Sequence, residues 1–140
     1  MALLDEVAVQ LVGQSVAGLP GTTGVTATGW TLTKAHLPAA PDKVVAVFET
    51  GGRANEMMDG GLLDRPTFQI RVRSSPNDYA TARTKIEAVR TALHLIGNEA
   101  LSSRYYAGIT ADAEPIPLPV DQNNRPGLVM NFSAWRSRTT

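Results

Sequence analysis

Apolar residues near the start of the chain recur at intervals of three and four. They are Leu3, Leu4, Val7, Leu11 and Val12. This spacing is typical of one face of an amphipathic helix, so we predict a helix over residues 3–16. Asp5, Glu6 and Gln10 fall on its other faces, and the two acids near its start suit the helix dipole. Residues 18–29 are rich in Gly and Thr and are predicted to form a loop.

Strict alternation of apolar and polar residues predicts a β-strand over residues 67–73. The positions expected to face one side are Phe68, Ile70 and Val72, and those expected to face the other are Thr67, Gln69, Arg71 and Arg73. Further strands are predicted over residues 30–34, 43–50, 104–110 and 128–135. Prolines at 115, 117 and 119 indicate a stiff extended piece, which a sheet tolerates only at its edge. Residues 121–127 have the composition of a turn.

A second helix is predicted after Ser75. Ser75 can cap it, Pro76 suits its first position, and Asp78 follows the cap by three residues. Its apolar positions, spaced three and four apart, are Tyr79, Ala82, Ile86, Val89, Leu93 and Ile96. Gly97 is predicted to end the helix as a C-cap.

The order of these elements predicts the fold class. A helix, two or three strands, a long helix and two or three more strands favour an α+β fold. We expect a mostly antiparallel sheet with an N-terminal helix and one long central helix packed on it. The 140 residues suit a single domain spanning residues 1–140.

The segment between the predicted strands, residues 51–65, is interpreted as a long functional loop bounded by glycine pairs. Its glycines do not form a phosphate-binding motif. Adjacent methionines in it can form an adaptable docking patch, and the arginines of the next strand form either a solvated sheet face or a protein–protein surface. The candidate interface residues are Met57, Met58, Arg65, Gln69, Arg71 and Arg73.

The sequence offers no recognisable catalytic apparatus. Cysteine is absent, the two histidines His36 and His94 are far apart, and no nucleophile motif is present. We therefore predict no enzyme activity, no catalytic residue, no metal site and no cofactor. The formal net charge is zero, which argues against nucleic-acid binding as the main function. Neither a signal peptide nor a membrane span is recognisable, so we expect synthesis in a cytoplasm.

Several stretches, taken in order, resemble one family of phage proteins. They are residues 41–52, 65–73, 79–83 and 115–119, Asp121 with Arg125, and Asn131 with Phe132. This order is similar to that of phage minor capsid proteins that include the tail terminators of long-tailed bacteriophages. The resemblance covers residues 1–136. Pro119 departs from it, since the family's turn is expected to hold a glycine there.

The resemblance implies a structural virion protein at the head-proximal end of the tail, similar in fold to the tail tube protein. Such a protein forms a ring, usually a hexamer, stops tail-tube polymerisation and offers a surface to the connector of the head. The implied partners are copies of itself, the tail tube protein and a head-completion or connector protein. The loop and the face of Arg71 and Arg73 are hypothesised to contribute to ring or tube contacts. The alternative is a head-completion or neck connector or another minor capsid protein; a small hydrolase and a nucleic-acid-binding module are further alternatives.

Overall fold

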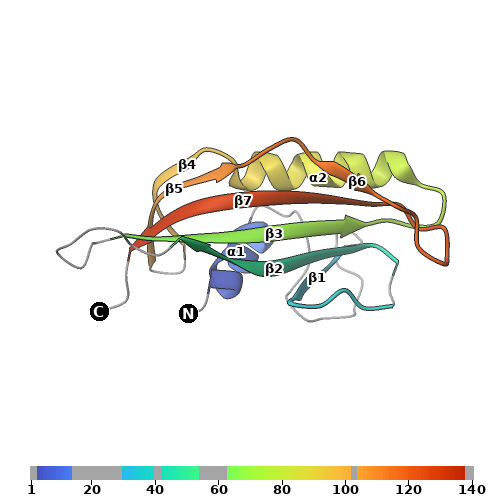
Figure 1. Ribbon diagram of the computed structural model, residues 1–140, viewed down its shortest axis with the longest axis horizontal. Coiled ribbons are helices and arrows are strands. Elements are labelled where there is room, and N and C mark those ends of the chain that lie inside the picture. Colours follow the sequence, from blue (N-terminus) through green and yellow to red (C-terminus); the bar gives the residue numbers. More distant parts are fainter. Residues whose placement is uncertain (1–2, 14–29, 40–41, 54–62, 102–103, 138–140) are drawn as a thin grey trace.

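Long antiparallel strands form the centre of the structure (Figure 1). The structure is a computed structural model and describes residues 3–13, 30–39, 42–53, 63–101 and 104–137. In chain order the elements are α1 (Leu3–Gly13), β1 (Thr31–Lys34), β2 (Val44–Arg53), β3 (Leu63–Arg73), α2 (Tyr79–Leu93), β4 (Ile96–Leu101), β5 (Arg104–Ala111), β6 (Ile116–Leu118) and β7 (Gly127–Ser137).

One sheet contains all seven of these strands, in the order β1-β2-β3-β7-β5-β4, with β6 paired to the part of β7 that β5 leaves free. The β1–β2 pair is parallel, and every other pair is antiparallel. The predicted α+β class with a mostly antiparallel sheet is therefore confirmed. The proline-rich piece also lies at an edge, as predicted, because β6 pairs with β7 on one side only.

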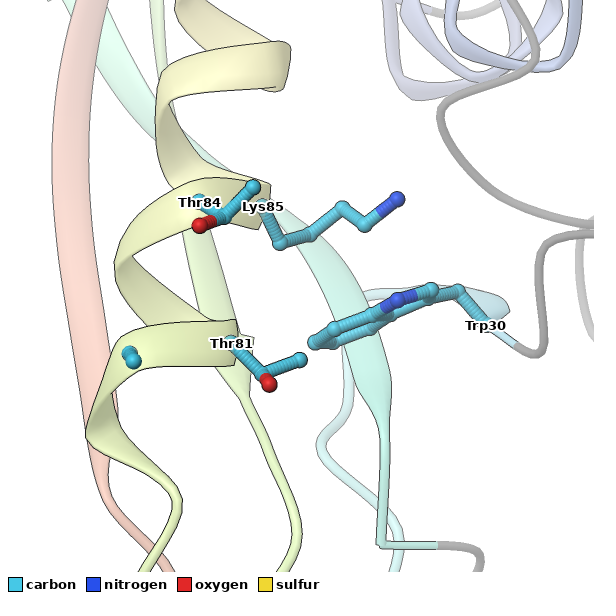
Figure 2. A pocket seen from close by; sticks show the side chains of 5 residues that line it. Trp30, Thr81, Thr84 and Lys85 are labelled. Carbon is cyan, nitrogen blue, oxygen red and sulfur yellow. The ribbon is translucent and has the colours of Figure 1, made fainter.

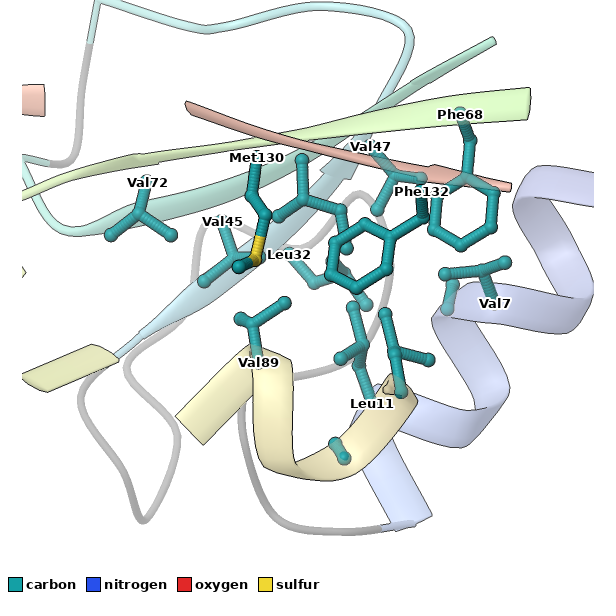
Figure 3. Close-up of a cluster of buried hydrophobic side chains, with 14 of the residues drawn as sticks. Val7, Leu11, Leu32, Val45, Val47, Phe68, Val72, Val89, Met130 and Phe132 are labelled. Atoms are coloured by element: carbon teal, nitrogen blue, oxygen red, sulfur yellow. The ribbon is translucent and has the colours of Figure 1, made fainter. Parts of the chain in front are cut away.

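The core lies between one face of the sheet and the two helices. Phe68 of β3 pairs directly with Phe132 of β7, and their rings stack with centroids 5.2 Å apart. Figure 3 shows Val7 and Leu11 of α1 and Val89 of α2 pointing toward the same cluster. Burying each of these large side chains contributes roughly 1.5–3 kcal/mol. The alternation that predicted β3 thus selects the face on which the helices pack.

The segment predicted as a loop over residues 51–65 is partly strand, which corrects that prediction. β2 continues to Arg53 and β3 begins at Leu63, while residues 54–62 lie outside the described residues. A bulge between Glu49 and Gly51 lets β2 continue. Gly51 and Gly52 have φ values of 96° and 126°, and a Cβ on Gly52 would lie 2.4 Å from the Arg65 carbonyl oxygen. The glycine pair therefore permits a bulged strand rather than starting a loop.

The long helix differs from its prediction at both ends. Its N-cap is Asp78, not Ser75, and the Asp78 carboxylate accepts a hydrogen bond from the Thr81 backbone N–H. At the other end α2 stops at Leu93, Leu95 adopts a φ of 65°, and the chain enters β4. Gly97, predicted as a C-cap, instead pairs with Gly108 in the sheet. The intervals of three and four between apolar residues continue past Leu93. This spacing alone could not show that the helix ends there and a short strand begins.

A buried polar cluster holds α1 against the sheet. Glu6 belongs to this cluster, whereas the helical spacing had placed it away from the apolar face of the helix. Glu6 is completely buried. Its Oε1 accepts a hydrogen bond of 2.6 Å from the Tyr106 hydroxyl and lies 3.2 Å from a guanidinium nitrogen of Arg136. Burial, together with the hydrogen bond to Glu6, raises the pKa of Tyr106 well above its usual range. One carboxylate thus joins α1, β5 and β7.

The predicted helix over residues 3–16 is confirmed through Gly13, and its last three residues and the loop predicted over residues 18–29 lie outside the described part of the chain. The predicted strands 30–34, 43–50, 104–110 and 128–135 correspond to β1, β2, β5 and β7. Neither α1 nor α2, the helices of the described residues, is long and apolar enough to cross a membrane.

Replacing Tyr106 with Phe is expected to destabilise the fold by about 2 kcal/mol, because the buried Glu6 carboxylate loses a hydrogen-bond donor. Denaturant unfolding followed by circular dichroism measures the change. Tyr79→Phe is the matched control, since Tyr79 is 46% exposed and its replacement should cost less than about 0.5 kcal/mol. Equal stability of the two variants would contradict a structural role for the cluster.

Candidate protein-interaction surface

The second face of the sheet, opposite the core, is covered by neither described helix. Side chains alternate along a strand. The residues adjacent in sequence to Phe68 and Ile70 on β3 therefore point away from α1 and α2. We call this surface the open face. Its central residues are Phe48 and Thr50 of β2, Arg65, Thr67, Gln69 and Arg71 of β3, and Asn131, Ser133 and Trp135 of β7.

Two arginines of the open face lie over aromatic rings of neighbouring strands. The Arg71 guanidinium lies 5.1 Å from the centre of the Phe48 ring, and that of Arg65 lies 5.4 Å from the Trp135 ring. Such contacts contribute roughly 0.5–1 kcal/mol each at exposed sites. Strand β3 itself carries no aromatic residue on this face, and the adjacent strands β2 and β7 supply both rings.

Hydrogen bonds fix the polar side chains between the two arginines. Arg71 Nε donates to Gln69 Oε1 at 2.8 Å, and Gln69 Nε2 donates to Asn131 Oδ1 at 3.0 Å. The hydroxyls of Thr50 and Thr67 are 2.6 Å apart. Two groups of hydrogen-bonded side chains therefore lie on the open face, one joining β3 to β7 and the other joining β2 to β3, and each restricts the rotamers of its members.

A shallow hollow of about 200 Å³ lies on this face beside the Arg65–Trp135 pair. It is lined by Arg65, Thr67, Ser133, Ala134 and Trp135. The Ser133 hydroxyl donates to Asp112 at 2.7 Å at the same edge of β7. Arginine, hydroxyl and indole groups together suit contact with another protein, because Arg and Trp are enriched in protein interfaces.

Arg73 follows the alternation of β3, but its side chain is only 6% exposed. Its Nε donates to the Asp42 backbone carbonyl at 3.0 Å. Burial, and secondarily the nearby charge of Arg125, lower the pKa of Arg73. The structure thus separates the buried Arg73 from the half-buried Arg65, Gln69 and Arg71. Alternation placed Gln69, Arg71 and Arg73 on one face, but it did not reveal that Arg73 is buried there.

Arg125 links the turn before β7 to Ala39 and Asp42. It is 6% exposed, its Nε donates to Asp121 at 2.8 Å, and one of its terminal nitrogens donates to the Ala39 carbonyl at 2.6 Å. The same nitrogen lies 3.3 Å from an Asp42 carboxylate oxygen. Hydrogen bonds from the backbone, first from Arg125, lower the pKa of Asp121. The predicted turn is thus held by ion pairs from a buried arginine to two partly exposed carboxylates, which the sequence did not reveal.

The remaining candidate residues are placed as follows. Met57 and Met58 lie outside the described residues. His94, one of the two histidines, accepts a hydrogen bond from the Ala111 backbone N–H through Nδ1. Among the described residues, no cluster of three or more His, Cys, Asp or Glu side chains could hold a metal ion.

The sequence was compared with known proteins. It matches the family described as "Bacteriophage tail terminator protein" over residues 14–136. No curated protein sequence matches it. A chain in a solved structure, that of the virion of a native gene transfer agent particle, has a similar fold, with a TM-score of 0.69 at 20% sequence identity. The alignment covers 98% of this chain and 96% of that one.

These findings place the protein among the structural proteins of phage tails. More narrowly, the chain belongs to the bacteriophage tail terminator family. The family consists of structural virion proteins, and the described residues show no arrangement that suggests catalysis.

Replacing Arg125 with Met is expected to destabilise the fold by about 1–3 kcal/mol, because Asp121 and the Ala39 carbonyl lose a charged hydrogen-bond donor. Arg71→Met is the matched control on the open face and should cost less than about 1 kcal/mol. Chemical denaturation of both variants measures the difference. A larger loss for Arg71→Met would contradict the division between a structural arginine and a surface arginine.

Proposed function

We propose that the protein forms a ring, expected to be a hexamer, at the head-proximal end of the phage tail. There it stops polymerisation of the tail tube and provides the surface that joins the tail to the head. Membership in the tail terminator family carries this proposal. The expected partners are further copies of the chain, the tail tube protein and a head-completion or connector protein.

The physical mechanism is capping. A closed ring with cyclic symmetry satisfies its lateral interfaces within one plane, so it does not grow sideways. One axial face of the ring copies the docking surface of the tube, and the other does not. Addition of further tube subunits therefore ends at the ring.

The open face supports a mechanism that acts by contact. Its arginines are held over aromatic rings and its polar groups are bonded to one another, so little conformational entropy remains to be lost on binding. We propose that Arg65, Gln69 and Arg71 contact a neighbouring subunit or the tube. Arg73 contributes indirectly, through its hydrogen bond to the Asp42 backbone carbonyl at the end of β3. Met57 and Met58 remain proposed contacts.

Native mass spectrometry over a concentration series, with negative-stain images of any assembled species, tests the ring. A six-fold particle with a central hole is the expected result. A dimer that persists at every concentration would contradict the ring, because two-fold pairing uses the surfaces that a ring needs. Antibody labelling of virions distinguishes this function from that of a head-completion or neck connector. A label on the head side of the head–tail joint would indicate the connector.

The double variant Arg65→Glu, Arg71→Glu is expected to weaken assembly, because it reverses both charges of the open face. The fraction of ring in native mass spectra and tail length in micrographs of phage carrying the variant are the measurements. Arg83→Glu with Arg90→Glu is the control, since it reverses equally many charges on α2. If the control impairs assembly as much as the open-face variant does, the open face has no special role.

A further inference from the structure

One edge of the sheet carries an exposed apolar segment. Strand β6 pairs with β7 on one side, and no described strand pairs with its other side (Figure 1). The chain reads Ile-Pro-Leu-Pro-Val over residues 116–120, and all five residues are exposed. Ile116 is 50% exposed and Val120 is 59% exposed. An exposed apolar edge of this kind normally invites the addition of a further strand, unless its backbone groups are blocked.

The opposite edge of the sheet differs, because a helix covers an aromatic side chain there. Trp30, the residue before β1, is only 3% exposed. Figure 2 shows Lys85 of α2 extending over its indole ring, and the ammonium lies 5.0 Å from the ring centroid. The side chains of β6, in contrast, are all exposed. Protection of the β6 edge therefore has to come from the chemistry of β6 itself.

The pairing register determines which backbone groups of β6 point away from the sheet. Ile116 pairs with Val129, and Leu118 pairs with the residue two positions before Val129. The Asn131 carbonyl accepts a hydrogen bond from the Asp112 backbone N–H, so alternate residues of β7 from Asn131 back through Val129 direct their backbone groups toward β5 and β6. Ile116 and Leu118 are thus the residues that hydrogen-bond to β7, and the residue between them directs its backbone outward.

That residue is Pro117, which has no backbone N–H. Pro115 and Pro119 lie two residues to either side, at positions of the same alternation. A strand adding to this edge needs N–H donors at these positions, and each of them carries a pyrrolidine ring instead. The β6 edge therefore combines apolar side chains, which favour association, with a backbone that cannot donate to a new strand.

We propose that the prolines of residues 115–119 close the β6 edge to strand addition by a second copy of the chain or by any other extended segment. Contact at this edge then depends on side chains and not on a backbone hydrogen-bond ladder. The block acts on backbone groups of β6, so the proposal does not depend on ring formation or on the open face. Its test can therefore fail while the proposed function holds, and the reverse.

Restoring the missing donors tests the block. The double variant Pro117→Thr, Pro119→Thr supplies two N–H groups on residues that favour extended backbone. Sedimentation velocity should show species larger than those of the parent chain at a roughly tenfold lower protein concentration, because the added strand gains hydrogen bonds. Pro76→Thr is the matched control, since Pro76 is also exposed but lies outside the sheet, and it should associate as the parent does. Equal association of the double variant and the parent would overturn the proposal.

Two further measurements distinguish strand addition from unfolding. Adding Ile116→Lys to the double variant should restore the association of the parent, because a charge on an edge strand opposes pairing. Amide deuterium exchange at positions 117 and 119 should be slower in the larger species than in the dispersed chain. Large species that persist with Ile116→Lys, or that exchange as fast as the dispersed chain, would refute strand addition. Circular dichroism verifies folding, and if the double variant does not fold, Pro119→Thr alone, outside the paired residues of β6, is compared with Pro76→Thr by the same criteria.

Discussion

The register between β3 and β7 is the constraint on which the rest of the structure depends. It places Phe68 opposite Phe132 and Ile70 opposite Met130 on one face, and Gln69 opposite Asn131 on the other. A slip by one residue would exchange the two faces, exposing the core side chains and burying the polar ones. The stacked phenylalanine rings on one face and the amide hydrogen bond on the other select the same register. The core and the open face are therefore two consequences of a single pairing.

The sequence predicted the parts of the fold that depend on simple periodicity. The alternation around Phe68 and the helical spacing from Tyr79 to Leu93 both correspond to observed elements. The errors occur where a distant segment changes the outcome. Gly51 and Gly52 are turn formers in isolation, yet pairing with β3 extends the strand through them. Likewise, the position of Gly97 after the apolar residues of the helix predicted a C-cap, but pairing with β5 makes it part of a strand.

The candidate surface was predictable only in part, for the same reason. Alternation along the predicted strand correctly placed Gln69 and Arg71 on one face, because it needs no knowledge of other strands, whereas Arg65, which β3 includes, had been assigned to the loop. It could not show which neighbours lie beside them, so the aromatic partners Phe48 and Trp135 were missed. Nor could it show that Arg73 is buried, since its neighbours Asp42 and Arg125 lie far from it in the sequence. Side-chain direction is local information, whereas burial depends on tertiary contacts.

Buried charged side chains lie at both ends of β7 and connect it to other parts of the chain. At one end Arg136 and Tyr106 hold Glu6, and at the other Arg125 holds Asp121. Burying such groups has a desolvation cost, and apolar replacements are often equally stable. Their directional hydrogen bonds, however, fix α1 and the turn before β7 relative to the sheet. For a structural tail protein, which acts through contacts with other subunits, a surface fixed before binding lowers the entropy lost on assembly. Glu6 and Arg125 thus contribute direction to the packing, which apolar residues at the same positions would not supply.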